Sequence, residues 1–299
     1  MVMPATLTTP PRPGRSGPGG AGRRLRAVLD LPRSARLAAW GTGVLSADVP
    51  LEPAVAAVLR DDEPHAVSFE EGASALPGLP GTPDDVRTLL AALAECAHTA
   101  GGGRLLLALP VPGDPRGLPG PAAVNVAALE AGECVVAELD GCAQRWALVP
   151  EVTEFGSVWE PGALVTWRVL GAAPRRAPES SSVAESEREL RVALSTATQA
   201  LATLDVARWR EDAADRIAAV RDGGLARDAV PAGTSPRVTR VLQTAARVLA
   251  IVDLATEDDG AAITSLEATS RARALREVAG VARRALVAAV NAHAEPARP

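Results

Sequence analysis

The amino-acid sequence predicts an α+β protein, in which a mixed sheet domain with flanking helices over residues 25–172 is followed by an antiparallel four-helix bundle over residues 183–295. Two observations predict this class. Short runs rich in Val, Leu and Trp recur in the first segment, as in strands. In the second segment, apolar residues recur at spacings of three and four, as on amphipathic helices. Residues 173–182 have the composition of a linker, and residues 1–24 that of a disordered Pro/Gly-rich leader.

In the first segment, a helix is expected over residues 51–60 and a strand over residues 65–69. A longer helix is predicted to begin with Thr82 as its N-cap and Pro83 at the first helical position, and Gly101–Gly103 is expected to end it. Further short apolar runs predict strands at residues 104–109, 134–139, 145–149 and 163–169, with another helix at 122–131. Because the last three strands leave no room for helices between them, we expect them to be antiparallel.

Four helix starts are recognisable in the second segment. Ser182 begins a capping box, and Ser235 followed by Pro236 matches a second N-terminus. The remaining two helices are expected to begin near Asp205 and Thr264. Short connections between four amphipathic helices predict that neighbouring helices run antiparallel.

The basic residues exclude two kinds of enzyme. All 31 of them are arginine, whereas a P-loop or a Schiff-base enzyme needs a lysine. Three histidines are present, so few side chains titrate near neutral pH. Abundant Ala, Gly, Pro, Val and Arg are typical of proteins from GC-rich bacteria, and this bias also accounts for the missing lysine. The absence of lysine therefore excludes certain chemistry but does not indicate a role.

Charge and hydropathy give expectations about partners and location. Residues 25–179 carry 11 arginines against 20 acidic residues, so this segment would repel a phosphate backbone, and no nucleic acid is expected as a partner. No apolar run has the length of a membrane span or resembles a signal peptide, which predicts a soluble cytoplasmic protein without a membrane partner. Widely spaced Cys96, Cys134 and Cys142 predict buried, reduced thiols. No metal site and no cofactor are expected.

The candidate ligand-binding site is the loop at residues 110–121, between a predicted strand and a predicted helix. Ligands often bind at this position in open α/β sheets. Asp114 and Arg116 are the charged residues of the loop, and they would act as a base or hydrogen-bond acceptor and as an anion clamp. Its prolines lack N–H donors, so a phosphate cradle is not expected. A rigid connection or a protein-docking loop is the alternative interpretation.

The candidate partner-docking residues are Arg276, Arg283 and Arg284 on the last predicted helix. A face rich in arginine can dock an anionic partner, although a solvated face with helical ion pairs accounts for the same residues. His65 follows a run of three acidic residues that could raise its pKa, although an exposed acidic turn explains the run equally well.

Clear folding signals without a recognisable catalytic constellation predict a non-catalytic cytoplasmic binding or adaptor protein with a protein partner. The Ala-rich helices leave room for a homodimer. The alternative is a small-molecule-binding protein or an enzyme that uses the Gly113–Pro121 loop. Convergence of Asp114, Arg116 and a carboxylate such as Glu70 or Glu138 in one deep pocket would favour that alternative.

Overall fold

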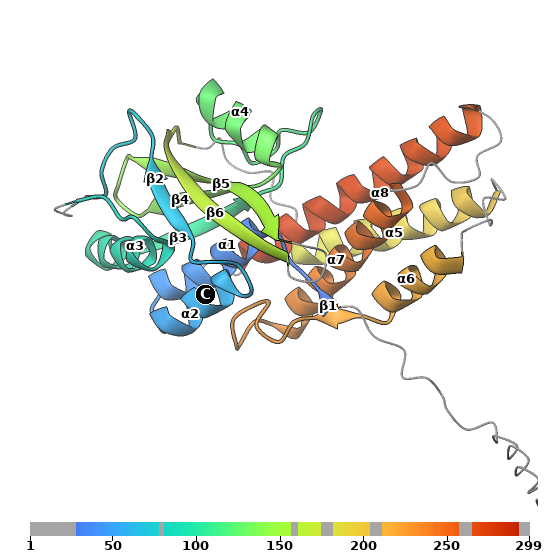
Figure 1. Ribbon diagram of the computed structural model, residues 1–299, viewed down its shortest axis with the longest axis horizontal. Coiled ribbons are helices and arrows are strands. Elements are labelled where there is room, and N and C mark those ends of the chain that lie inside the picture. The colour runs from blue at the N-terminus through green and yellow to red at the C-terminus, as the bar shows by residue number, and fades with distance from the viewer. Residues whose placement is uncertain are drawn as a thin grey trace, which may run out of the picture.

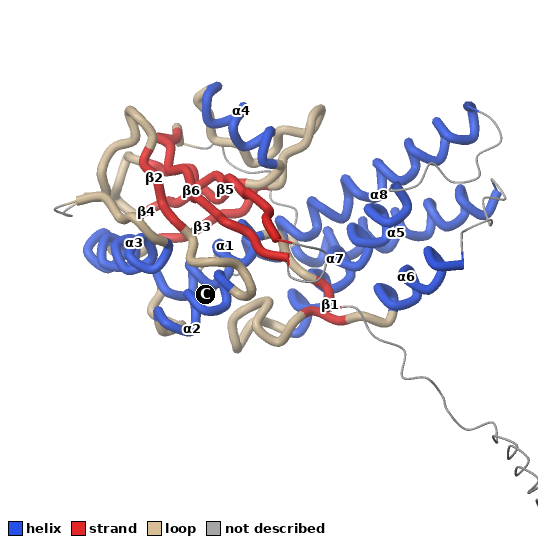
Figure 2. Tube along the Cα trace, viewed as in Figure 1, coloured by secondary structure: helices blue, strands red, loops and turns tan. Residues whose placement is uncertain are grey.

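The computed structural model describes residues 28–77, 81–156, 161–174, 182–203, 211–256 and 265–292. The predicted leader and most of the predicted linker lie outside these residues. The fold is mixed α+β, with a five-stranded sheet that has helices on both faces, beside a group of long helices (Figures 1 and 2). No helix in the described part of the chain combines the length and the apolar character needed to cross a membrane.

The sheet is mixed, and most of its strands are antiparallel. Its strands are β2 (Ala66–Phe69), β3 (Gly103–Ala108), β4 (Cys134–Leu139), β5 (Arg145–Gly156) and β6 (Pro161–Ala172). They are ordered β2-β6-β5-β4-β3, with antiparallel pairing from β3 to β6 and parallel pairing of β2 with β6. This confirms the predicted antiparallel run. β5 and β6 are longer than predicted, because residues 151–156 and 161–166 continue to pair with each other.

Both faces of the central strands are buried over most of their length, which explains why their sequences are mostly apolar. Leu105 and Leu107 face a large core, whereas Leu106 and Ala108 face a smaller core under one helix. The smaller core lies beneath α4 (Ala122–Ala131), and the larger one contains α1 (Arg33–Leu45), α2 (Leu51–Leu59) and α3 (Val86–Ala100). Except for α1, these helices lie where the sequence predicts helices.

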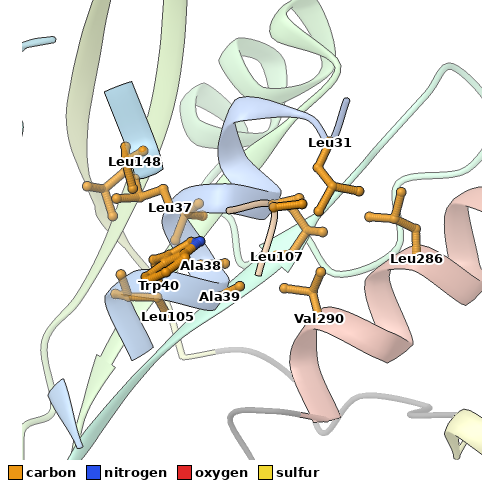
Figure 3. Close-up of a cluster of buried hydrophobic side chains, with 14 of the residues drawn as sticks. Leu31, Leu37, Ala38, Ala39, Trp40, Leu105, Leu107, Leu148, Leu286 and Val290 are labelled. Carbon is orange, nitrogen blue, oxygen red and sulfur yellow. The ribbon is translucent and has the colours of Figure 1, made fainter. Parts of the chain in front are cut away.

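Helix α1 is buried along almost its whole length and was not predicted. Every residue from Ser34 to Leu45 is buried, so the helix has no exposed face. Its glycines also weaken a helical pattern. Gly41 is required by packing, since a Cβ atom there would lie 2.3 Å from Leu105 Cδ1. Side chains of α1 lie between the sheet and the last helix (Figure 3).

The start of α3 differs from the prediction. Asp85, and not Thr82, is the N-cap: its carboxylate accepts a hydrogen bond from the Thr88 amide at 2.7 Å, and the Thr88 hydroxyl accepts one from the Asp85 amide at 3.3 Å. The residues before the cap are extended because they pair with β2, where Val67 N donates to Asp84 O at 2.8 Å. The predicted Thr82 cap, with Pro83 at the first helical position, is therefore wrong, because the backbone before Asp85 pairs with β2.

The second half of the described chain is helical. Its elements are α5 (Val183–Thr203), α6 (Glu211–Arg221), α7 (Pro236–Thr256) and α8 (Ser265–Asn291), with β7 (Gly224–Leu225) pairing in parallel with β1 (Val28–Leu29). The caps at Ser182 and Ser235 are confirmed, since each hydroxyl accepts a hydrogen bond from the amide three residues later, at 3.2 and 3.3 Å. The predicted starts at Asp205 and Thr264 lie outside the described residues.

One core joins the sheet to these helices. Leu286 and Val290 of α8 belong to the same buried cluster as Leu107 of β3 and Leu31 before α1 (Figure 3). The indole N–H of Trp40, which belongs to the same cluster, donates to the carbonyl oxygen of Asp228 at 3.0 Å. The two halves of the chain therefore pack as one body at this boundary.

The free edge of β3 is closed by two side chains from helices. The Thr42 hydroxyl of α1 accepts a hydrogen bond from Leu105 N at 3.0 Å and donates one to Leu105 O at 3.1 Å. The Asn291 side chain of α8 accepts from Leu107 N at 2.8 Å and donates to Leu107 O at 3.1 Å. Backbone groups that would otherwise be unpaired inside the protein are thus satisfied.

Candidate functional site

The loop at residues 110–121 is held rigidly at both ends. Residues 111–114, with the sequence Val-Pro-Gly-Asp, suit a type II turn. Val111 N donates to Asp114 O at 3.2 Å, and Asp114 N donates to Val111 O at 2.8 Å. Gly113 has a φ of +87°, which the turn requires at this position. At the other end, the Ala173 amide donates to Gly120 O at 3.0 Å.

Asp114 links the loop to helix α8. Its Oδ1 lies 3.0 Å from Arg116 Nε, and its Oδ2 lies 3.8 Å from Arg284 Nη1. The structure therefore brings together both residues that were predicted for ligand binding and one that was predicted for partner docking. The Asp114 side chain is 24% exposed, so this carboxylate is mostly covered by its arginine partners.

Arg116 and Arg284 lie on an open groove of about 610 Å³, which we call the arginine groove. It is lined by residues of the loop, α5 and α8: Arg116, Arg188, Glu189, Val192, Ala193, Val281 and Arg284. Three guanidinium groups thus surround small apolar side chains. Val192 is the most exposed apolar side chain in this lining, at 65%.

The other two predicted docking arginines lie differently. Arg283 is half-buried, and burial lowers the pKa of its guanidinium, although the Asp114 carboxylate acts in the opposite direction. Arg276 is exposed and does not line the arginine groove. Of the three arginines predicted on this helix, Arg284 is the one that the groove includes.

The carboxylates considered for a catalytic site do not line the groove. Glu70 Oε1 lies 2.7 Å from Arg168 Nε. Glu138 Oε2 lies 2.8 Å from Arg104 Nη2, and its Oε1 lies 3.8 Å from Arg145 Nε. These are pairings within the sheet, so a deep pocket combining Asp114 and Arg116 with either carboxylate is not formed.

Sequence reasoning missed a second group of charged residues, at the start of α1. Arg33 Nε and Nη2 donate to the two carboxylate oxygens of Asp62, both at 2.8 Å, and Arg60 donates to Asp30. The hydrogen bonds that Arg33 donates to Asp62 raise the pKa of Arg33. Arg33 and Arg36 are separated by three positions, a spacing that places two side chains on the same face of a helix. This spacing is informative only if the segment is recognised as a helix.

A buried histidine extends this group into the core. The Trp167 indole N–H donates to His65 Nδ1 at 3.1 Å, so Nδ1 carries no proton, and Nε2 donates to Asp62 Oδ2 at 3.2 Å. Burial lowers the pKa of His65 and outweighs the Asp62 carboxylate, which raises it. The net direction is opposite to the one that the acidic run indicated.

We expect His65 to make the protein less stable in mild acid. Because the pKa of His65 is lowered in the folded state, the unfolded chain takes up a proton near pH 6.5 that the folded chain does not. Stability present above that pH is therefore lost as pH falls, by up to about 1.4 kcal/mol per pH unit. Urea unfolding between pH 8 and pH 5 should show a shallower pH dependence for His65→Gln than for the wild type.

The matched control is His98→Gln, since His98 is exposed on α3. Its pH dependence should equal that of the wild type. Burial raises the pKa of Glu133, which changes stability with pH in the opposite sense, but this contribution is common to all three proteins. If the unfolding free energies of His65→Gln and the wild type changed equally with pH, the pKa of His65 would be the same in the folded and unfolded states, and the expectation would be wrong.

The cysteines lie apart from both groups. Cys96 and Cys134 are buried and Cys142 is half-buried, and none of the three forms a disulfide bond. Burial raises the pKa of the Cys96 thiol. Within the described ranges, no three His, Cys, Asp or Glu side chains are grouped so that they could hold a metal ion.

Comparison with known proteins gives two matches to family models. Residues 34–181 match the model described as Rv1486c-like protein, N-terminal domain, and residues 184–287 match the model described as Rv1486c-like protein, C-terminal domain. Comparison with curated proteins and with solved structures gives no match.

Proposed function

Because the chain carries both domains of the Rv1486c-like family over most of its length, it belongs to that family, and we propose that it is a non-catalytic cytoplasmic binding protein that docks an acidic segment of a protein partner. The proposed docking site is the arginine groove. The observation that carries this proposal is the arrangement of Arg116, Arg188 and Arg284 around exposed apolar side chains.

Charge in the groove favours an acidic partner. Its lining contains three arginines and one acidic residue, Glu189. The nearby carboxylate of Asp114 is already paired with Arg116 and Arg284, so it offers little to a basic partner. Complementary charge guides association and selects partners, and arginine is enriched at protein interfaces.

The shape of the groove favours a protein segment over a small substrate. The groove is open, and Val192 stands exposed at its surface, where an apolar side chain of a partner could cover it. Small-molecule sites are usually concave and bury most of their ligand. An acidic segment that also carries an aliphatic residue would satisfy both the arginines and Val192.

The scaffold of the groove supports the same function. We infer that α5 to α8 act as the antiparallel four-helix bundle predicted from the sequence, with α5 and α8 fixing the spacing between Arg188 and Arg284. The loop is tied to α8 through Asp114 and adds Arg116. Residues on rigid elements bind without a large cost in ordering.

Site-specific photocrosslinking tests this proposal in native cells. Benzoylphenylalanine placed at Val192 should crosslink to a distinct protein, whose crosslinked peptide is acidic. Arg188→Glu and Arg284→Glu should each weaken binding of that peptide at least tenfold, since a lost charge pair commonly costs more than 1.4 kcal/mol at an interface. Fluorescence anisotropy with the labelled peptide measures the affinities.

Two controls accompany this experiment. Val126, which is 54% exposed on α4, provides a crosslinking site away from the groove. Arg276→Glu places the same charge reversal on α8 outside the groove and should leave affinity unchanged. If residue 192 crosslinked to a second copy of this chain, the groove would be a homodimer interface and the proposal would be wrong. If residues 192 and 126 crosslinked to the same proteins in equal amounts, the groove would not be a specific docking site.

A further inference from the structure

The outer parts of β5 and β6 extend beyond the rest of the sheet. β4 pairs with β5 over residues 145–148, and β2 pairs with β6 over residues 166–169. Residues 151–156 of β5 are therefore paired with β6 on one side, and no strand of the described chain lies on their other side. We call this unpaired border of residues 151–156 the β5 edge. It shares no residue with the arginine groove.

The hydrogen bonds of β6 identify the backbone groups that point outward along the β5 edge. Ala163 O accepts from Glu63 N at 3.2 Å, so the backbone groups of Ala163 point away from β5. Ala163 lies opposite Glu154, which makes this a non-hydrogen-bonded pair of the antiparallel ladder. The N–H and C=O groups of Glu154 therefore point away from β6, and so do those of Val152, two residues earlier. Among the described strands, none pairs with these groups.

The β5 edge is exposed and acidic. Glu151 is exposed, and so is every residue from Thr153 to Gly156. The nearby basic residue, Arg168 of β6, is already paired with Glu70, with 2.7 Å between its Nε and the carboxylate Oε1. Opposite charges on neighbouring strands stabilise their pairing, and like charges destabilise it. A strand with basic side chains would therefore pair better with this edge than an acidic one.

One face of these strands also presents two apolar side chains. Phe155 is 47% exposed and Leu164 is 52% exposed. They lie on the same face, because Phe155 is opposite Gly162 and Leu164 is two residues further along β6. The Phe155 ring lies across Gly162, where a Cβ atom would be 2.5 Å from its Cζ. The ring is thus held next to the β5 edge, where an apolar side chain of an added strand could cover it.

We propose that the β5 edge binds an extended segment of a partner protein as an additional strand, and that this segment alternates basic and apolar residues. Its main chain bonds to Val152 and Glu154, which provides affinity, and its side chains provide specificity. Side chains of a strand alternate between the two faces. The basic residues therefore lie on the face of Glu154, and the apolar residues lie on the face of Phe155.

Two other occupants fit the β5 edge less well. A second copy of this chain, paired through the same edge, would bring its own Glu151 and Glu154 against these carboxylates. A helix would leave the outward groups of Val152 and Glu154 unpaired, because the N–H and C=O groups of a helix are bonded within it. An extended segment of different sequence satisfies both the backbone and the charges.

Fluorescence anisotropy with labelled octapeptides and the full chain tests this proposal. An octapeptide of alternating arginine and valine should bind saturably. The same octapeptide with every peptide nitrogen methylated keeps its side chains but lacks backbone donors, and it should bind at least tenfold more weakly. An octapeptide of alternating glutamate and valine, which has the opposite charge, should also bind at least tenfold more weakly.

Three variants separate the backbone from the charge. Glu154→Pro removes an outward N–H group, at a position of the kind where edge strands tolerate proline, and should weaken binding of the arginine–valine peptide at least tenfold. Glu154→Gln keeps the N–H group and should weaken binding about two- to fivefold. Glu95→Gln, the matched control, removes an exposed carboxylate on α3 and should bind like the wild type.

Exchange of individual amide hydrogens, followed by NMR in the wild type, decides the matter if Glu154→Pro does not fold. The arginine–valine peptide should slow exchange at Val152 and Glu154 at least tenfold, and should leave Thr153 and Phe155, which face β6, unchanged. Equal slowing at all four amides, equal binding of either comparison peptide, or wild-type affinity in Glu154→Pro would overturn the proposal. If the chain alone sedimented as a dimer that Glu154→Pro made monomeric, the occupant would be a second copy, and the proposal would be wrong.

Discussion

The Leu286→Ala variant should lose about 2–5 kcal/mol of unfolding free energy, the range measured for buried leucines in other proteins. Leu286 is fully buried on α8, in the cluster that also contains Leu107 of the sheet (Figure 3). Because the two family domains share this cluster, the cavity should destabilise both. Hydrogen exchange measured by mass spectrometry should show at least thirtyfold faster exchange for amides of β4 and β5, although the substitution lies in the other domain.

Val192→Ala is the control for this experiment. Val192 also lies on a C-terminal helix, but its side chain is 65% exposed, so the variant should remain within about 0.5 kcal/mol of the wild type. If Leu286→Ala melted the helices while exchange in β4 and β5 stayed at its wild-type rate, the two domains would be independent folding units.

The Thr42→Val variant should lose about 2–4 kcal/mol, although valine has almost the same shape as threonine. The Thr42 hydroxyl is the hydrogen-bond partner of both the amide and the carbonyl of Leu105 on the edge of β3. Thr42 is 5% exposed, so water cannot readily replace the hydroxyl. Each buried backbone group left without a partner costs about 1–3 kcal/mol. Chemical denaturation followed by circular dichroism measures the loss.

Two further variants isolate the hydrogen bonds from the change in volume. Thr42→Ser keeps the hydroxyl and should recover most of the stability that Thr42→Val loses. Thr99→Val removes a hydroxyl that bonds to Glu95 O on the exposed face of α3, and should cost little. If Thr42→Val were as stable as Thr42→Ser, the edge of β3 would not depend on this side chain.

The elements that sequence analysis placed well are those whose signals are local. β4 has the predicted bounds, because a continuous apolar run between turns is typical of a strand buried on both faces. Ser182 and Ser235 cap α5 and α7 because a hydroxyl three residues before a helical amide is sufficient for this hydrogen bond. In both cases the relevant interactions lie within a few residues along the chain.

The elements that were missed depend on distant partners. β3, α3 and α8 all contact α1, so the burial of this helix depends on residues that are distant in the sequence. The need for glycine at position 41 likewise arises from Leu105, which lies against it. The start of α3 moved from Thr82 to Asp85 because the preceding backbone pairs with β2. These misses follow from tertiary structure overriding local propensity.

The residues of the candidate site were predicted separately, and the sequence did not show that they lie close together. Asp114 and Arg116 were chosen as the charged residues of a loop, and Arg284 was chosen as part of a helical face. Their proximity joins residues about 170 positions apart, as the Asp114–Arg284 ion pair shows. The charged group at the start of α1 was missed for a related reason: Arg33 and Arg36 belong to the helix that was not recognised.

The side chains that close β3 also bear on whether a strand from another molecule can pair with this sheet. An open sheet edge invites strands from other molecules and leads to aggregation or to strand-addition complexes. Leu105 and Leu107 are already bonded to Thr42 and Asn291, and the opposite edge strand, β2, spans four residues and is bonded to the segment before α3. A peptide that approaches β3 at Leu105 and Leu107 meets backbone groups that are already occupied.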